Sequence, residues 1–238
     1  MKKRVCAVIC AAGKGLRAGF DKNKLLFCVD GISVLERTVQ AFYFEGIDEI
    51  IVTYSPDDLK EMQAALSGFD NIKFVQGGDT RTASVYNALQ AVESEIVLIH
   101  DGARPFVSRK VIEGCVQSVL EFGSGICAVP CTDTMGVKGT TNELIRVPDR
   151  NLLVRIQTPQ GFFTKDILGA SEHFTSGLYK QELTPSQSTL FCIKFATSHI
   201  IFLALSHSPL SSESIATLIL SQARDRESCL ADKLSLLS

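Results

Sequence analysis

Residues 4–13 read RVCAVICAAG, and this apolar run ending in small residues opens the fold of the chain. The run is brief and rich in β-branched residues, and a segment rich in glycine and lysine follows it directly. A secretory signal has a longer apolar region and a cleavage site at this point. We therefore predict that the run is a first buried strand that ends in a glycine-containing turn.

Outward from this strand, short apolar runs alternate with helical patterns as far as residue 130. The apolar runs are VCAVIC, EIIVTY, IKFVQ, EIVLIHDG and GICAVP, and the helical patterns between them are SVLERTVQAFYF, DLKEMQAALSG, TASVYNALQAV and VIEGCVQSVLEFG. Such alternation is typical of βαβ units. It predicts an α/β fold, a doubly wound and mostly parallel sheet with helices on both faces, in a single domain over residues 1–238.

The rhythm changes twice after residue 130. Residues 131–160 contain turn signals at Lys138-Gly139 and Pro148-Asp149 between short, partly polar strands, so we predict a projecting β-arm. Residues 182–238 form an atypical C-terminal segment, rich in Ser and Leu and poor in acidic residues and glycine. Its periodicity is ambiguous, and a helix that packs on the sheet is the simplest interpretation.

Composition excludes several classes of partner. The chain has 24 Lys and Arg residues against 26 Asp and Glu residues, a net charge of -2, which disfavours electrostatic binding to nucleic acid or to an anionic membrane. No other segment approaches the ~20 apolar residues of a membrane span. The eight cysteines are scattered without a CxxC pair, which favours a reduced, cytoplasmic protein with neither a zinc site nor a catalytic thiol.

The turn after the first strand, AAGKGLR with KNK further on, has the composition of an anion-binding loop. Gly13 and Gly15 allow a ligand to approach the backbone N–H groups, while four cations, Lys14, Arg17, Lys22 and Lys24, follow within a short window. The spacing fits neither a Walker A loop nor a dinucleotide fingerprint. A phosphate cradle and a solvated basic turn both remain open from this loop taken by itself.

Two further loops follow predicted strands. In QGGDTRTASV, residues 76–85, Asp79 or Thr80 is suited to cap a helix, and Arg81 and Ser84 would lie in its first turns. In HDGARP, residues 100–105, Asp101 is suited to bind Mg²⁺ and Arg104 to bind a phosphate, because ligands of open α/β sheets lie at the carboxyl ends of the strands. His100 fits a hydrogen-bonded structural histidine better than a base.

Taken together, AAGKGLR with Lys24, GGDTRTASV, HDGARP, PCTDTM, DRN and TPQGF resemble, in order and spacing, the 2-C-methyl-D-erythritol 4-phosphate cytidylyltransferases of isoprenoid precursor synthesis. The resemblance covers about residues 4–170 and implies a Rossmann-like nucleotidyltransferase that uses CTP, methylerythritol phosphate and Mg²⁺. It implies the following CTP-binding residues: Ala11, Ala12, Gly13, Gly15, Lys24, Gly77, Asp79, Ser84, Asp101 and Gly102. Arg17 and Lys24 would stabilise the transition state, and Asp101 would hold the metal ion.

The resemblance also implies a site for the sugar-alcohol phosphate. Its residues are Asp101, Arg104, Thr134, Arg150 and Thr158, with Arg150 counted as catalytic. The family's arm reaches into a neighbouring subunit, so a homodimer is expected, in agreement with the marginal stability of a lone two-stranded hairpin.

The chain departs from the family pattern at two places. Asn23 stands before Lys24 where the family usually has proline, which suggests a less rigid loop. After residue 182 the acidic and Asn-Ile-Lys motifs of the family are missing, and we interpret this as a disrupted reading frame or sequence near residues 182–188. Two alternatives therefore accompany the main interpretation: a ribitol-5-phosphate cytidylyltransferase, and a CTP-binding protein whose turnover the altered tail impairs.

Overall fold

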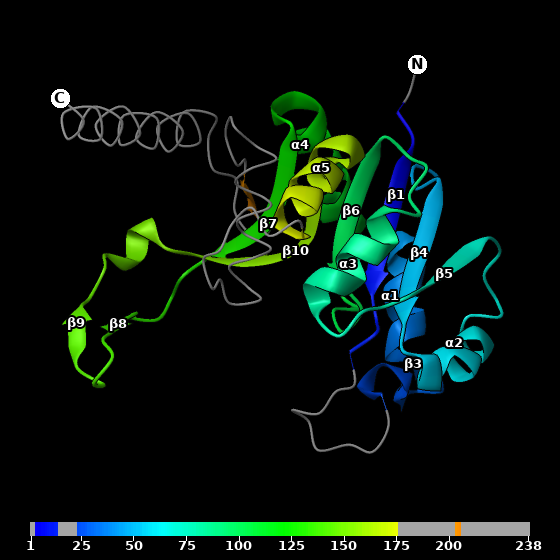
Figure 1. Ribbon diagram of the computed structural model, residues 1–238, viewed down its shortest axis with the longest axis horizontal. Helices are drawn as coiled ribbons and strands as arrows, with labels where there is room; N and C mark the ends of the chain where they lie inside the picture. The colour runs from blue at the N-terminus through cyan, green and yellow to red at the C-terminus, as the bar shows by residue number, and fades with distance from the viewer. Residues whose placement is uncertain (1–2, 14–22, 176–202, 206–238) are drawn as a thin grey trace. The chain divides into compact units, whose positions relative to one another are not determined.

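The structure is a computed structural model that describes residues 3–13, 23–175 and 203–205 (Figure 1). Residues Met1–Leu205 form one compact unit around a seven-stranded sheet of order β11-β7-β10-β6-β1-β4-β5. The strands of this sheet are β1 (Val5–Cys10), β4 (Glu49–Tyr54), β5 (Ile72–Gln76), β6 (Ile96–Asp101), β7 (Ser124–Pro130), β10 (Val154–Phe163) and β11 (Leu203–Leu205). Among these, β10 runs antiparallel to its neighbours β6 and β7, and the other pairs are parallel. The predicted mostly parallel α/β sheet is confirmed.

Helices cover both faces of the sheet, as the term doubly wound requires. The α-helices are α1 (Val34–Phe42), α2 (Leu59–Ala65), α3 (Arg81–Leu89), α4 (Arg109–Phe122) and α5 (Thr164–Thr175). Alternate residues of β1 divide between two cores. Val5, Ala7 and Ile9 join the core that α1, α2 and α4 cover. Cys6 and Val8 join the core of α3 and α5 on the other face.

Local signals set the ends of the helices. The Glu36 N–H donates to Ser33 Oγ at 3.0 Å at the start of α1, and the Ala83 N–H donates to Thr80 Oγ1 at 3.1 Å at the start of α3. Gly123, with φ +84°, ends α4 in the left-handed conformation that glycine adopts without strain. Of the two predicted caps for α3, the chain uses Thr80.

Short elements connect this framework. They are the 3₁₀ turns η2 (Lys24–Leu26), η3 (Pro56–Asp58) and η4 (Arg150–Leu152), the hairpin β2 (Cys28–Val29) with β3 (Ile32–Ser33), and the hairpin β8 (Val137–Lys138) with β9 (Leu144–Arg146). The segment predicted as an arm, residues 131–160, contains β8, β9 and η4. From Val154 onward it belongs to the main sheet, because β10 pairs with both β6 and β7.

The described part of the C-terminal segment is a strand. β11 pairs in parallel with β7, with Leu203 opposite Ile126, so the helix expected over this stretch is wrong for residues 203–205. The rest of residues 182–238 lies outside the described residues. In the part of the chain that the structure describes, no helix is both long and apolar enough to cross a bilayer.

Candidate active site

The three predicted ligand-binding loops meet at one edge of the sheet. β1, β4 and β6 are parallel neighbours, so their carboxyl ends lie together. The loops that follow β1 and β6 touch, because the Gly102 N–H donates to the Cys10 carbonyl at 3.0 Å. The loop after β5 reaches the same place, since a Cβ built on Gly77 would lie 2.3 Å from Ala12 Cβ. The sequence therefore placed these loops correctly beside one another.

Close packing explains two of the glycines before any ligand is considered. A Cβ on Gly77 would also lie 2.8 Å from Ser84 Oγ, and a Cβ on Gly102 would lie 2.9 Å from the Cys10 carbonyl oxygen. By contrast, a Cβ on Gly13 would meet no atom of the described residues within 4 Å. The loops after β5 and β6 thus need glycine for their approach to β1, whereas Gly13 is exposed and open.

Ser84 fixes the shape of the Gly77-Gly78 loop. It is buried, its Oγ accepts from the Gly78 N–H at 3.0 Å, and its hydroxyl lies 2.9 Å from the Thr80 carbonyl. Asp79 is exposed at the tip of this loop. Within the chain, Ser84 therefore holds the loop together, and Asp79 faces solvent.

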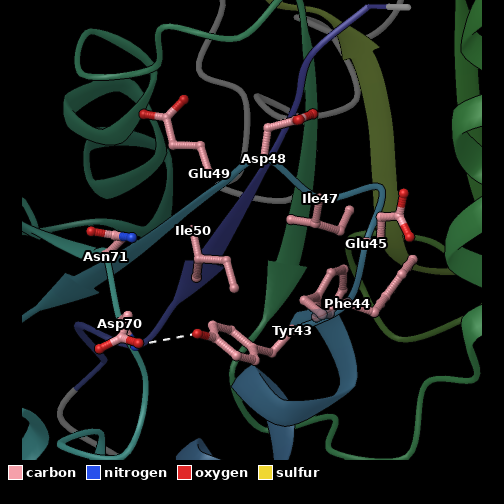
Figure 2. Close-up of a pocket in the computed structure, with 10 residues that line it drawn as sticks. Tyr43, Phe44, Glu45, Ile47, Asp48, Glu49, Ile50, Asp70 and Asn71 are labelled. Carbon is pink, nitrogen blue, oxygen red and sulfur yellow. Dashed lines mark hydrogen bonds between the residues drawn. The ribbon is translucent and has the colours of Figure 1, made fainter.

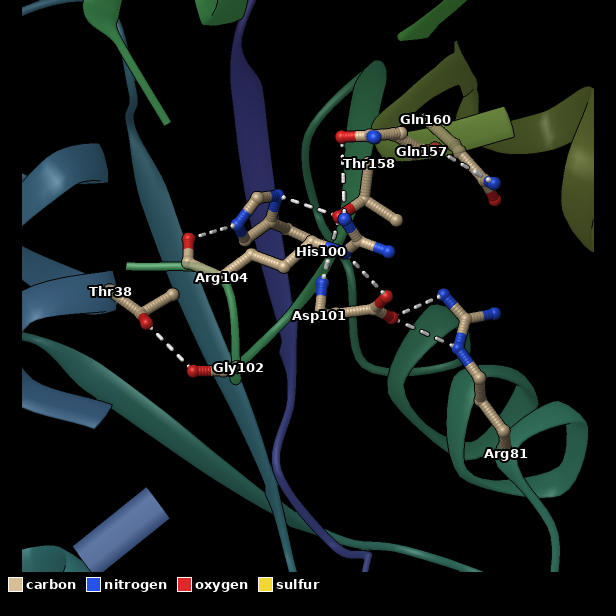
Figure 3. A network of polar contacts seen from close by, with 9 residues as sticks. All are labelled: Thr38, Arg81, His100, Asp101, Gly102, Arg104, Gln157, Thr158 and Gln160. Atoms are coloured by element: carbon tan, nitrogen blue, oxygen red, sulfur yellow. Dashed lines mark hydrogen bonds and ion pairs between the residues drawn. The ribbon is translucent and has the colours of Figure 1, made fainter. Parts of the chain in front are cut away.

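Asp101 lies between two guanidinium groups (Figure 3). Arg81, in the first turn of α3, donates Nε and Nη2 to Asp101 Oδ1 at 3.2 and 2.9 Å. Arg104 donates Nε to Oδ2 at 3.2 Å. Burial alone would raise the pKa of Asp101, but the charges and hydrogen bonds of Arg81 and Arg104 outweigh it and hold that pKa below its usual value. The carboxylate is therefore ionised and oriented at neutral pH.

His100 is buried beneath this cluster and is hydrogen-bonded at both ring nitrogens. Nε2 lies 3.0 Å from the Arg104 carbonyl and Nδ1 lies 3.1 Å from Thr158 Oγ1. Burial lowers the pKa of His100 to about 4, so the ring is neutral at pH 7. Because a carbonyl only accepts, the proton sits on Nε2 and the Thr158 hydroxyl donates to Nδ1. This agrees with a structural histidine.

Thr158 belongs to the same network from the neighbouring strand β10. Its Oγ1 accepts from the Asp101 N–H at 3.2 Å, and the residue is buried. Arg104 extends to this strand too, donating Nη1 to Gln157 Oε1 at 3.3 Å. Thus Asp101, Arg104 and Thr158, three of the residues predicted for the alcohol phosphate, lie together.

The loop that carries Lys24 is anchored by Asn23. Asn23 is buried, its Nδ2 donates to the Ala11 carbonyl at 3.2 Å and to Asp58 Oδ2 at 2.9 Å, and its Oδ1 accepts from the Leu25 N–H at 3.0 Å. Three hydrogen bonds thus anchor Asn23, and the expectation of a less rigid loop stays a prediction because residues 14–22 lie outside the described residues. Lys24 itself is exposed.

Two backbone N–H groups after β1 already have hydrogen-bond partners within the protein. The N–H groups of Ala11 and Ala12 donate to Thr53 Oγ1 at 3.0 and 3.3 Å. The first residue beyond them is the exposed Gly13. Gly15 and Arg17, which the sequence also predicted for this site, lie outside the described residues.

Two predicted residues stand apart from the Asp101 network. Thr134 lies between β7 and β8 and Arg150 begins η4, and both are exposed. Among the residues that the structure describes, no hydrogen bond or ion pair joins either of them to Asp101, Arg104 or Thr158.

The donor set around Asp101 fits a magnesium ion held mainly by its substrate. In the part of the chain that the structure describes, no three His, Cys, Asp or Glu side chains are grouped to hold a metal ion. Mg²⁺ bound with nucleotides commonly takes one or two carboxylates and completes its shell with phosphate oxygens and water. Asp101, with its side chain 32% exposed, offers one such carboxylate.

A separate cavity of about 320 Å³ opens at the other end of the sheet, around the start of β4 and the end of α1 (Figure 2). Its lining includes Phe42 and Ile50, and the Asp70 N–H donates to Tyr43 OH at 3.4 Å between two other lining residues. The described residues that line it include four acidic side chains, Glu45, Asp48, Glu49 and Asp70. This charge disfavours a triphosphate, so the cavity is not the nucleotide site.

Several residues of the site were absent from the predicted set. Asn23, Thr53, Arg81 and His100 make their key contacts with partners distant in the sequence. Arg81 and His100 carried local signals, the first as a cation in the first turn of a helix and the second as a hydrogen-bonded structural histidine, but neither was counted among the site residues.

Comparison with known proteins identifies relatives over most of the chain. Residues 5–183 match the protein family described as 2-C-methyl-D-erythritol 4-phosphate cytidylyltransferase (IspD). The enzyme of that name from Bacillus cytotoxicus is 39% identical over 171 residues, which cover 69% of this chain and 75% of the relative. The one from Clostridium perfringens is 39% identical over 164 residues, covering 67% and 73%.

Solved structures agree. The 4-diphosphocytidyl-2C-methyl-D-erythritol synthase of Anaerococcus prevotii superposes with a TM-score of 0.73 at 28% identity, covering 93% of this chain and 97% of its own. The 2-C-methyl-D-erythritol 4-phosphate cytidylyltransferase of Thermus thermophilus gives 0.62 at 26%, covering 94% and 100%.

Proposed function

This chain belongs to the 2-C-methyl-D-erythritol 4-phosphate cytidylyltransferase family, and we propose that the edge of the sheet around Asp101 is where it transfers a cytidylyl group. The substrates are CTP and 2-C-methyl-D-erythritol 4-phosphate. The products are the CDP-alcohol and pyrophosphate.

The observation that carries this assignment is the Arg81–Asp101–Arg104 cluster. Two guanidinium groups and one carboxylate lie beside the loops after β1 and β5, at the edge where open α/β sheets bind ligands. Guanidinium groups bind phosphate oxygens in a fixed, often bidentate geometry. Arg104 is the more open of the two, with its side chain 43% exposed.

The reaction needs positioning and charge more than a protein nucleophile. A phosphate oxygen of the alcohol substrate attacks the α-phosphorus of CTP, a new P–O bond forms, and the bond to the β-phosphate oxygen breaks, so pyrophosphate leaves. Lys24 and Arg17 neutralise the charge that develops at the α-phosphate. Burial raises the pKa of the neighbouring Cys10 to about 11, which supports a mechanism without a thiolate.

Asp101 would hold Mg²⁺, which supplies charge neutralisation for the triphosphate. The Arg81 and Arg104 ion pairs keep the carboxylate ionised and oriented for this role. The nucleotide contacts are assigned to Ala11, Ala12, Gly13, Gly15, Lys24, Gly77, Asp79, Ser84, Asp101 and Gly102. Thr53 accepts from the Ala11 and Ala12 N–H groups, and the carbonyl of the buried Ala11 accepts from Asn23, so Ala12 would contact the nucleotide through its surface and carbonyl while Ala11 would shape the site from beneath.

The alcohol phosphate is assigned to Asp101, Arg104 and Thr158 of one chain, with Thr134 and Arg150 from the arm of a second. A homodimer is supported by exposed apolar side chains in and beside the arm: Met135, Leu144, Ile145, Val147 and Leu152. A two-stranded hairpin with exposed apolar side chains is stabilised when a partner surface buries those side chains. Buried free thiols such as Cys6 and Cys115 support a reducing, cytoplasmic location.

A pyrophosphate-release assay tests the proposed function. The full chain is given CTP and Mg²⁺ with either methylerythritol phosphate or ribitol 5-phosphate, and we expect release with the first. Release with ribitol 5-phosphate only would reject the substrate, and a reaction with neither would reject the activity.

A second candidate, a CTP-binding protein without turnover, is favoured by the extent of the family match. That match ends at residue 183, where the atypical segment begins, so the family's later motifs have no counterpart. CTP would then raise the melting temperature by mass action while no product forms. Thermal shift and product formation measured on the same sample separate the two candidates.

A further inference from the structure

His100 occupies a core position where an aliphatic residue would be expected. It follows Ile96 and Leu98 on the same face of β6, is 0% exposed, and packs on the Phe42 ring with centroids 4.8 Å apart. A buried polar ring is costly unless its polar atoms are hydrogen-bonded. The use of histidine here therefore has to be explained by what its two nitrogens hold.

The Nε2 atom holds the loop that carries Arg104. It donates to the Arg104 carbonyl at 3.0 Å, and the Arg104 N–H in turn donates to the Asp101 carbonyl at 3.0 Å. The backbone of Arg104 is thus fixed at the residue whose guanidinium reaches Asp101 and Gln157 (Figure 3).

The Nδ1 atom holds the neighbouring strand. It lies 3.1 Å from Thr158 Oγ1, which also accepts from the Asp101 N–H at 3.2 Å. One ring therefore joins the end of β6, the loop after it and β10. The adjacent Gly102 is held by other groups, since its carbonyl accepts from Thr38 Oγ1 at 2.7 Å and its N–H donates to the Cys10 carbonyl.

We propose that His100 is a positioning residue for the alcohol phosphate: it fixes Arg104 and Thr158 relative to Asp101 without touching either substrate. This inference rests on the proposed function, because it takes Arg104 and Thr158 as ligands of that substrate. The effect falls on the alcohol rather than on CTP, since Gly102 and the loops after β1 and β5 keep their own contacts, and Asp101 keeps its ion pair with Arg81.

Three variants separate the two links. In His100→Gln the longer side chain places an amide near the Nε2 position, where it still donates to the Arg104 carbonyl. In His100→Asn the shorter side chain places an amide near the Nδ1 position and keeps only the Thr158 link. His100→Leu fills the space and keeps neither.

The KM for each substrate and the melting temperature are measured for the wild type and the three variants. We expect His100→Leu to raise the KM for methylerythritol phosphate by about tenfold or more, with the KM for CTP changed less than about twofold and the fold retained. His100→Gln should recover most of the alcohol KM, and His100→Asn should not. Equal KM values for the alcohol in the Gln and Asn variants would overturn the proposal. This comparison decides the question even if His100→Leu does not fold. A parallel rise in both KM values with a lowered melting temperature, which marks a purely structural role, would also overturn the proposal.

Hydrogen exchange at the Arg104 amide gives a readout that does not need turnover. We expect faster exchange in the Leu and Asn variants and near-native exchange in the Gln variant. Unchanged exchange in all three variants contradicts the positioning role. If the wild-type chain shows no activity but this exchange pattern appears, the proposed function fails and the hold of His100 on the loop stands.

Discussion

Asn23 anchors the turn that begins at Lys24 through the hydrogen bonds of its side chain. Its amide joins the end of β1, through the Ala11 carbonyl, to Asp58 in η3, and its oxygen caps the turn that begins at Lys24. Each such bond contributes about 1 kcal/mol when both partners are buried. The Asn23 side chain therefore positions the backbone at Lys24, although Asn23 is not itself among the predicted substrate-binding residues.

Replacing Asn23 tests this directly. Asn23→Ala should lower the free energy of unfolding by about 2 kcal/mol and reduce turnover, because all three bonds are lost. Asn23→Asp keeps the cap on the Leu25 N–H but places a second carboxylate beside Asp58, so it should be the less stable of the two at neutral pH and improve on acidification. Chemical denaturation measures both, with Gln63→Ala on the exposed side of α2 as the control. An Asp variant as stable as the wild type would contradict the arrangement.

His100 gives the fold a defined pH dependence. Its folded pKa of about 4 lies below the ordinary value of 6.5, so between these values the unfolded chain binds a proton that the folded chain does not. The contribution of the neutral His100 to the free energy of unfolding is therefore fully present above about pH 6.5, and it is lost as the pH is lowered toward 4. The unfolding free energy of His100→Gln, measured from pH 8 to pH 4, should be flatter than that of the wild type in this window. Parallel curves would show that His100 does not remain neutral in the folded protein.

The loop between β5 and α3 is shaped by close contact with β1. A Cβ at Gly77 would lie 2.3 Å from Ala12 Cβ, so the loop and the strand end cannot both keep their positions in a Gly77→Ala variant. We expect a loss of about 2 kcal/mol in stability and a raised KM for CTP.

The matched control is Gly114→Ala in α4, where a Cβ meets nothing within 4 Å in the part of the chain that the structure describes. That variant should be neutral or slightly more stable, because alanine favours a helix interior. If both variants have the melting temperature of the wild type, the loop at Gly77 moves away from Ala12 without cost, and the close contact does not restrict this position.

Elements with a local signal were predictable, and those set by distant partners were not. The alternation of apolar runs and capped helices, such as Ser33 before α1 and Thr80 before α3, is local and gave the layered sheet. β10 was placed in the arm because its sequence is partly polar, whereas its position depends on pairing with β6 some 60 residues earlier, as with Gln160 opposite Ile99. The Arg81–Asp101 and His100–Thr158 contacts likewise join segments that no spacing rule connects.

The arm exposes large apolar side chains that a second subunit would cover. Leu144 and Leu152 are 65% and 77% exposed in one chain. If these side chains face a second subunit, Leu144→Glu combined with Leu152→Glu should convert a dimer into monomers in sedimentation equilibrium and lower turnover. Leu120→Glu, at an exposed position of α4, should leave the dimer intact. A monomeric wild type, or a dimer that survives the arm variant, would count against the shared site.

The proposed function depends on turnover at the edge of the sheet where Lys24, Asp101 and Arg104 lie. The most direct measurement is pyrophosphate release from CTP and methylerythritol phosphate by the full chain and by Lys24→Ala, with Lys60→Ala on α2 as the control. We predict that the wild type and the Lys60 variant react, and that Lys24→Ala loses about a hundredfold in turnover with an unchanged melting temperature. Undiminished turnover in Lys24→Ala would exclude Lys24 from the active site, and no product from the wild type would contradict the proposed cytidylyl transfer.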